Sequence, residues 1–168
     1  RRIVEKDVSR GKMTKEKGEA LLDLITTTDS YDDVKGADLV IEAVFENQEL
    51  KAKITDQAEA VISEEAVMGS NTSTLPITGL AKASKRPENF IGIHFFSPVE
   101  RMGLVEIING KQTSEATLAK AIDYVLAIRK TPIAVNDSRG FYTSRCVGTY
   151  IHEGMKMLAE GIKPAIIE

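Results

Sequence analysis

The sequence predicts an α/β fold built on a parallel sheet, followed by the start of a helical domain. Short apolar runs alternate three times with amphipathic, helix-prone segments along the middle of the chain. Such alternation is typical of βαβ units, in which helices connect parallel strands. After a turn at residues 137–140 the pattern changes to one long helix. We therefore expect a sheet domain over residues 1–137 and a helical domain over residues 138–168.

The first quarter of the chain carries helix and turn signals. Residues 3–24 are charged and helix-prone, Gly11 interrupts them, and Thr14 is suited to cap the helix that follows. Residues 25–28 are all β-branched and predict a short strand. Residues 31–36 predict a helical turn that ends at a glycine, a residue that readily ends helices.

The middle of the chain gives the clearest strand and helix signals. An apolar run at residues 37–44 predicts a buried strand whose only interior charge is Glu42. The helix expected at residues 116–128 can be capped by Thr113 or Ser114. We expect further strands at residues 66–70, 90–93, 104–108 and 132–136, and helices at residues 47–62, 75–83, 116–128 and 141–160.

Composition excludes several classes of function. The 22 basic and 25 acidic residues nearly balance, so we expect no nucleic-acid partner. The single cysteine excludes a disulfide framework, no apolar run is long enough to span a bilayer, and we expect no metal site. A reducing compartment fits best: the cytoplasm, or mitochondria or peroxisomes in a eukaryote. Because the chain opens at Arg1 inside a predicted helix, we expect it to be a piece of a longer protein.

One histidine and one glutamate suggest an acid/base pair. His94 ends the apolar run at residues 90–93, and ligands of parallel sheets bind at the carboxyl ends of strands. Glu106 lies inside the next apolar run, where a carboxylate needs a cationic or hydrogen-bonding partner. Taken alone, His94 could be structural, and Glu106 could face solvent on an edge strand.

Several motifs together resemble a known family over nearly the whole chain. They are ADLVIEAVFENQELK, SNTSTLPI, RPENFIGIHFFSPV, LVEIING and DSRGF. These segments resemble the 3-hydroxyacyl-CoA dehydrogenases of fatty-acid β-oxidation, and HFF-x-P followed by LVE is the most specific of them. The variants SPVERM and NDSRGFYTSR are more similar to the multifunctional α-subunits of fatty-acid oxidation complexes than to the short monofunctional enzymes.

The resemblance implies a fold, a cofactor and a reaction. It implies a Rossmann-like, doubly wound sheet that lacks its first βαβ part, followed by the start of an all-helical C-terminal domain. The implied reaction is NAD-dependent oxidation of L-3-hydroxyacyl-CoA to 3-ketoacyl-CoA. The G-x-G-x-x-G loop that holds the pyrophosphate in such folds is absent from the chain. We therefore expect the parent protein to bind NAD and this chain, if isolated, to bind it poorly.

The resemblance also implies roles for particular residues. His94 matches the catalytic base, Glu106 the carboxylate that orients it, and Ser73 a hydroxyl that contacts the reacting oxygen of the substrate. The implied cofactor contacts are Ala43, Glu46, Lys51 and Asn71. Against these roles, Glu46 and Lys51 could be ordinary helix surface charges, and residues 71–74 could be only a capping loop.

Two positions depart from the family pattern. Ser97 and Ser144 each stand where many relatives have asparagine, at an implied cofactor contact and an implied substrate contact respectively. A serine hydroxyl cannot replace both ends of an amide, so a bridging water or an altered contact is needed. We do not expect either serine to be essential.

Two other functions stay open on the sequence. The first is a monofunctional 3-hydroxybutyryl-CoA dehydrogenase, which an upstream enoyl-CoA hydratase domain would exclude. The second is a non-catalytic remnant or assembly module that keeps the fold without holding the cofactor. The expected partners are an acyl-CoA substrate and either a second copy of the parent protein or a thiolase-containing complex.

Overall fold

The computed structural model describes residues 1–168 and divides into two compact units, Arg1–Asp33 and Val34–Glu168. The first unit contains two helices, α1 (Arg2–Ser9) and α2 (Lys15–Asp23). The Thr14 hydroxyl accepts a hydrogen bond from the Lys17 amide at 3.3 Å, which confirms the predicted helix cap. Gly11 has a φ of +68° between the two helices, as the predicted interruption requires.

The strand predicted at residues 25–28 is wrong. These residues form no regular secondary structure, and the Ile25 amide instead donates to the Leu22 carbonyl in a turn. β-Branched side chains favour extended backbone, but a strand is stable only beside a hydrogen-bonded neighbour. No other segment of the chain pairs with this one.

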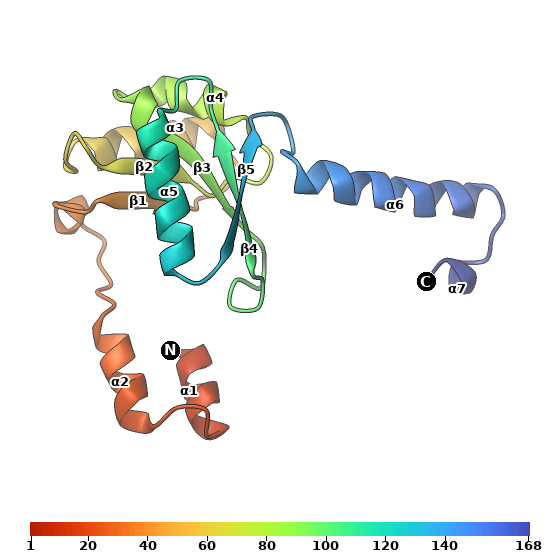
Figure 1. Cartoon of the computed structure of the whole chain (residues 1–168), viewed down its shortest axis with the longest axis horizontal. Coiled ribbons are helices and arrows are strands. Elements are labelled where there is room, and N and C mark those ends of the chain that lie inside the picture. Colours follow the sequence, from red (N-terminus) through yellow and green to blue (C-terminus); the bar gives the residue numbers. More distant parts are fainter. The chain divides into compact units, whose positions relative to one another are not determined.

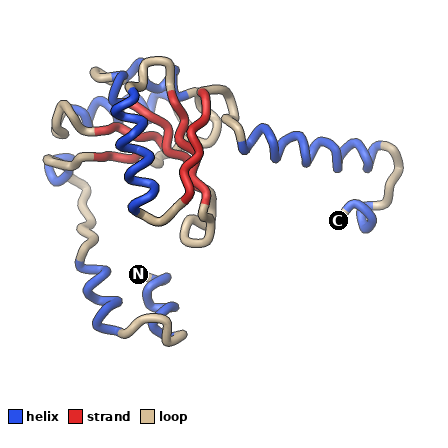
Figure 2. Tube along the Cα trace, in the orientation of Figure 1, coloured by secondary structure: helices blue, strands red, loops and turns tan.

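The second unit is built on a five-stranded sheet with strands in chain order (Figures 1 and 2). Neighbouring strands are parallel except β3 and β4, which are antiparallel. The sheet is therefore mixed, whereas the sequence predicted a parallel one. Its strands are β1 (Leu39–Glu42), β2 (Val67–Ser70), β3 (Phe90–Phe95), β4 (Leu104–Asn109) and β5 (Thr131–Asn136).

Helices cover both faces of this sheet, so the doubly wound arrangement is confirmed. Helix α5 (Glu115–Ala127) packs Ala121 and Val125 into an apolar cluster with Ile91 and Ile93 of β3. Helix α4 (Ile77–Leu80) lies against Gly92 instead. Successive residues of a strand point to opposite faces, so α4 and α5 are on opposite sides. Helix α3 (Gln48–Glu59) packs against α4 and β1.

The sheet approaches α4 so closely at Gly92 that a side chain does not fit there. A Cβ at this position would lie 2.8 Å from both the Ile108 Cβ and the Ile77 side chain. We expect Gly92→Ala to lower the free energy of unfolding by about 1–3 kcal/mol, because packed neighbours must move. Urea denaturation tests this. Gly79→Ala is the control, since nothing lies within 4 Å of that Cβ position; equal stability of both variants would contradict the expectation.

The last part of the chain consists of α6 (Thr143–Ala159) and the short α7 (Pro164–Ile167). Before α6, Gly140 and Phe141 both have positive φ angles, +74° and +47°, and the Phe141 side chain is buried. Two consecutive left-handed residues turn the chain sharply, so α6 begins two residues later than predicted. No helix combines the length and apolar character needed to cross a bilayer. The domain boundary at residues 137 and 138 stays a prediction.

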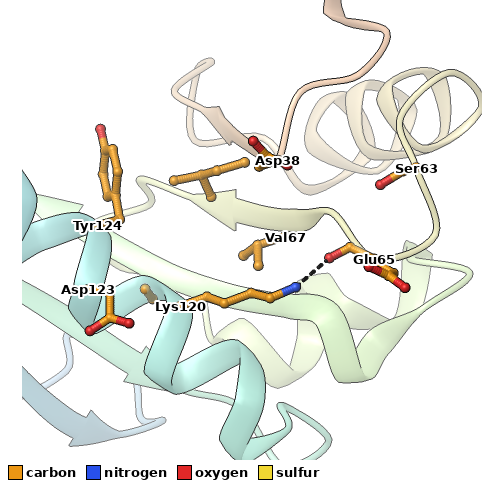
Figure 3. Close-up of a pocket in the computed structure, with 9 residues that line it drawn as sticks. Asp38, Ser63, Glu65, Val67, Lys120, Asp123 and Tyr124 are labelled. Carbon is orange, nitrogen blue, oxygen red and sulfur yellow. Dashed lines mark hydrogen bonds between the residues drawn. The ribbon is translucent and has the colours of Figure 1, made fainter.

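A pocket of about 410 Å³ lies beside β1, β2 and α5 (Figure 3). Asp38, Leu39 and Val67 place it at the amino ends of β1 and β2. The Lys120 side chain extends across the pocket, and its ammonium donates to the Glu65 carbonyl at 2.9 Å. Ligands of parallel sheets bind at the other, carboxyl ends of strands, and the predicted site residues lie there.

Candidate active site

Antiparallel pairing of β3 and β4 sets His94 directly opposite Glu106. The imidazole Nδ1 lies 2.8 Å from the Glu106 Oε2, which is hydrogen-bonding distance. His94 is 5% exposed and Glu106 is completely buried. The alternative of a solvent-facing glutamate on an edge strand is therefore wrong, and the two residues form a buried acid/base pair.

The Glu106 carboxylate receives three further hydrogen bonds from the start of α6. Its Oε1 accepts from the Tyr142 and Thr143 amides at 3.0 and 2.9 Å, and its Oε2 accepts from the Thr143 hydroxyl at 2.7 Å. Neither residue was predicted from the sequence. The positive φ of Phe141 immediately before them is what aims their amides at the sheet, and a phenylalanine gives no sequence signal for that conformation.

These hydrogen bonds decide the charge state of Glu106. Burial by itself raises the pKa of the carboxyl group, but the bonds from His94, Thr143 and Tyr142 outweigh it, so the pKa of Glu106 is lowered. Glu106 is therefore an anion at neutral pH. A buried carboxylate beside Nδ1 favours the imidazole tautomer with its proton on Nδ1, which leaves Nε2 able to accept a proton.

The lowered pKa of Glu106 makes folding stability depend on pH. Its contribution is complete above the unfolded-state pKa of about 4.5 and is lost as pH falls through the lower folded-state pKa. We expect the free energy of unfolding to fall less steeply below pH 4.5 in Glu106→Gln than in the unmodified protein. Urea titrations at several pH values measure both slopes. Parallel slopes would show that Glu106 is not a stabilising anion.

Aromatic rings flank the imidazole of His94. The ring centroid of Phe96 lies 4.7 Å from that of His94, and the ring centroid of Phe141 lies 5.9 Å away, both in tilted arrangements. Such packing fixes the plane of the imidazole while adding no competing hydrogen bond. Together with the Glu106 contact, it holds the nitrogen that would accept a proton in one orientation.

Four of the predicted site residues line a single open cavity of about 490 Å³. It lies where the chain leaves β1 and β2 at their carboxyl ends. The Asn71 side chain connects this cavity to the acid/base pair, since its Oδ1 accepts from the amide of Phe95, the residue after His94, at 2.8 Å. The full lining is Ala43, Val44, Phe45, Glu46, Leu50, Asn71 and Ser73.

Glu46 organises the loop that carries Ser73. Its carboxylate accepts from the Thr72 hydroxyl at 2.8 Å and from the Ser73 amide at 2.6 Å. The Thr72 hydroxyl in turn accepts from the Leu75 amide, which lies before α4. The first amides of α4 donate to the Asp137 carboxylate, so the capping role considered for residues 71–74 is wrong. The exposed Ser73 hydroxyl has no partner within the chain, and Glu46 is a structural group of the cavity wall rather than an ordinary surface charge.

Lys51 is not a surface charge either. It is 2% exposed, and its ammonium donates to both Glu42 oxygens at 3.1 and 3.0 Å and to the Val44 carbonyl at 3.1 Å. The Ser70 hydroxyl also bonds to Glu42. This buried ion pair explains the charge inside the predicted apolar strand. It also brings the Lys51 ammonium to 4.0 Å from the Glu46 carboxylate at the cavity.

Ser97 and Ser144 stand apart from this cavity. Both are exposed; Ser97 precedes Pro98 through a cis peptide bond, and Ser144 lies in the first turn of α6. Neither lines the cavity that contains Ser73. No group of three or more His, Cys, Asp or Glu side chains is arranged to hold a metal ion.

Comparison with known proteins identifies the family. The family described as "3-hydroxyacyl-CoA dehydrogenase, NAD binding domain" matches residues 1–138, which include the whole sheet and the His94–Glu106 pair. The chain belongs to this family. Among solved structures, the (S)-3-hydroxybutyryl-CoA dehydrogenase from Ralstonia eutropha superposes with a TM-score of 0.91 at 39% identity, over 95% of this chain and 56% of that one. The Rossmann-like fold predicted for this family member is thereby confirmed.

The most similar proteins by sequence include fatty acid oxidation complex α-subunits. Those from Colwellia psychrerythraea and Idiomarina loihiensis are 45% and 46% identical over 95% and 96% of this chain. The chain spans 22% of the length of each. A 3-hydroxybutyryl-CoA dehydrogenase from Escherichia coli K12 has a TM-score of 0.91 at 31% identity, over 95% of this chain and 34% of that one.

The residues present fit one end of a dinucleotide. The cavity at the carboxyl ends of β1 and β2 offers a free hydroxyl at Ser73, a fixed carboxylate at Glu46 and an exposed ring at Phe45, beside the acid/base pair. These groups suit a ribose and a flat heterocycle. The chain contains no G-x-G-x-x-G loop, so no pyrophosphate cradle of that kind is among these residues.

Proposed function

We propose that the protein containing this chain oxidises L-3-hydroxyacyl-CoA to 3-ketoacyl-CoA with NAD, as a step of fatty-acid oxidation. The observation that carries the proposal is the buried pair in which His94 Nδ1 lies 2.8 Å from a carboxylate held by three further hydrogen bonds. Family membership supports the same reaction, since the matching family is defined by this activity and by NAD binding.

The geometry suits removal of a proton from an alcohol. Bound NAD would supply the acceptor for the hydride of the carbon that bears the hydroxyl group. His94 takes the hydroxyl proton on Nε2 and becomes an imidazolium, and the Glu106 anion opposite Nδ1 stabilises that positive charge. Because Glu106 is already fixed and ionised before reaction, little reorganisation accompanies the change in charge.

The cavity residues have matching roles in this proposal. Asn71, Glu46 and Ala43 line the space for the nicotinamide ribose, and the free Ser73 hydroxyl contacts the reacting oxygen of the substrate. Lys51 contributes indirectly through Glu46, since its ammonium lies 4.0 Å from the Glu46 carboxylate. Ser97 remains a proposed cofactor contact and Ser144 a proposed substrate contact. Neither serine is expected to be essential.

We place the chain in a multifunctional α-subunit rather than a short enzyme. The α-subunits named above are 45% and 46% identical to it, compared with 39% and 31% for the two 3-hydroxybutyryl-CoA dehydrogenases. The proposal therefore includes an enoyl-CoA hydratase domain elsewhere in the protein, a cytoplasmic location, and either a homodimer or a complex with a thiolase. A monofunctional 3-hydroxybutyryl-CoA dehydrogenase is the second candidate.

Formation of NADH tests the proposed reaction. The purified protein is mixed with NAD and (S)-3-hydroxybutyryl-CoA, or a longer (S)-3-hydroxyacyl-CoA, and absorbance at the NADH band is followed. The (R)-enantiomers are the control, because only one face of the reacting carbon can meet both base and cofactor. Turnover of the (S)-substrates supports the proposal. A folded sample that neither binds NAD nor turns over any chain length would support the non-catalytic module instead, and a sample that binds NAD without turnover would contradict the proposed reaction.

A further inference from the structure

Glu106 Oε2 is shared by two hydrogen-bond donors. One is His94 Nδ1 at 2.8 Å, and the other is the Thr143 hydroxyl at 2.7 Å. Oε1, by contrast, meets only backbone amides, those of Tyr142 and Thr143. The Thr143 side chain is thus the one side-chain group besides His94 that bonds to this carboxylate, and it bonds to the oxygen that faces the base.

We infer that Thr143 is a positioning residue that sets the basicity of the His94–Glu106 pair through Oε2. A donor on a carboxylate oxygen draws negative charge toward itself, so less of that charge is available to a second partner on the same oxygen. The Thr143 hydroxyl therefore weakens the stabilisation of the His94 imidazolium by Glu106. It also favours the ionised form of Glu106 over the protonated form. This inference rests on the proposed function only for its kinetic consequence.

No other charged side chain forms a salt bridge with His94 or Glu106, so the Thr143 hydroxyl can affect the basicity of the pair. Ile133 of β5 lies beside Glu106 in the sheet, and the rings of Phe96 and Phe141 flank His94. The only salt bridge of either residue is the one between them, so no lysine or arginine competes with the hydroxyl. Tyr142 brings its amide to Oε1, while its side chain is 59% exposed.

The variant Thr143→Val removes the hydroxyl and keeps the shape of the side chain and both amide bonds to Oε1. We expect the acid-side midpoint of the pH profile of kcat/KM to rise by about half a pH unit, since one charge-assisted hydrogen bond is lost while the orientation of Glu106 is kept. The alkaline plateau should stay within about twofold, because the base and its carboxylate remain in place. Thr143→Ser should restore the original midpoint.

Thr149→Val is the matched control. It makes the same substitution on the same helix, where the Thr149 hydroxyl donates only to the Cys146 carbonyl. Its profile should match that of the unmodified protein. A Thr143→Val enzyme with lower activity at every pH and an unmoved midpoint would assign Thr143 a merely structural role and overturn the inference.

A second measurement does not need catalysis. Histidines labelled with ¹³C are titrated by NMR, and the His94 signal is identified by its loss in His94→Gln. The midpoint of this signal should rise in Thr143→Val and return in Thr143→Ser. A shifted NMR titration in a protein without turnover would support the inference while contradicting the proposed function. Coincident titrations of all variants would overturn the inference whatever the activity.

Discussion

Replacing His94 with glutamine is expected to lower kcat by a factor of about 10²–10⁴, the usual contribution of a general base. Glutamine fills a similar volume and can still donate to Glu106, but it cannot accept a proton at neutral pH. Because the loss arises in the chemical step, KM for the acyl-CoA should change little. Steady-state NADH formation in the unmodified and variant proteins measures both constants.

The chain offers a control histidine for this experiment. His152 is exposed on α6, and its Nδ1 lies 2.7 Å from the Gly148 carbonyl of the same helix. His152→Gln should leave kcat unchanged. If His94→Gln retained more than about a tenth of the original kcat, general-base catalysis by His94 would be excluded, since even the weakest such contribution exceeds that factor.

Replacing Lys51 with methionine is expected to lower the free energy of unfolding by about 3–5 kcal/mol, because Glu42 would stay buried without its counter-charge. Lys51 provides the only cation that contacts Glu42, and both side chains are 2% exposed. Most domains are stable by only about 5–15 kcal/mol, so the variant should be close to unfolding at ambient temperature. Urea denaturation followed by circular dichroism measures the difference.

Two further variants test whether the lost stability comes from the unpaired Glu42 charge or from other effects of losing Lys51. Adding Glu42→Gln to Lys51→Met should recover part of the lost stability, because the unpaired carboxylate is removed. Lys85→Met breaks an exposed pair with Asp56, 2.9 Å apart, and should cost less than about 1 kcal/mol. A double variant less stable than Lys51→Met would show that the unpaired charge is not the cause.

Most elements of the sheet domain could be predicted from local pattern. The runs before Glu42, Ser70 and His94 are short and apolar, and each became a strand close to its predicted bounds. The direction of β4 was harder to predict, because strand pairing depends on where the connecting loop returns and leaves little trace in composition. The wrong strand prediction at residues 25–28 has the same cause, because β-propensity depends on the residues of the segment itself, whereas strand pairing depends on distant segments.

The acid/base pair was foreseen, but what surrounds it was not. Family motifs pointed to His94 and Glu106, and the structure brings them to hydrogen-bonding distance. Their roles in catalysis remain proposals. Thr143 is 37 residues from Glu106 in sequence, and a threonine at the start of a helix ordinarily suggests only a local cap. Lys51 could not be distinguished from a surface lysine until the folded chain placed it beside Glu42.

The pairing of His94 with Glu106 is sensitive to changes of length inside the two strands and insensitive to most changes in the loop that connects them. The cross-strand register fixes the distance between the two side chains, so deleting one residue inside β4 would turn Glu106 to the opposite face of the sheet. Phe96 packs against His94, but the exposed loop residues 97–102 carry no such constraint, because their number does not enter the ladder. That stretch is therefore free to lengthen, shorten or change its chemistry while the pair stays intact, so members of the family can differ there without disturbing the two residues proposed to remove the proton.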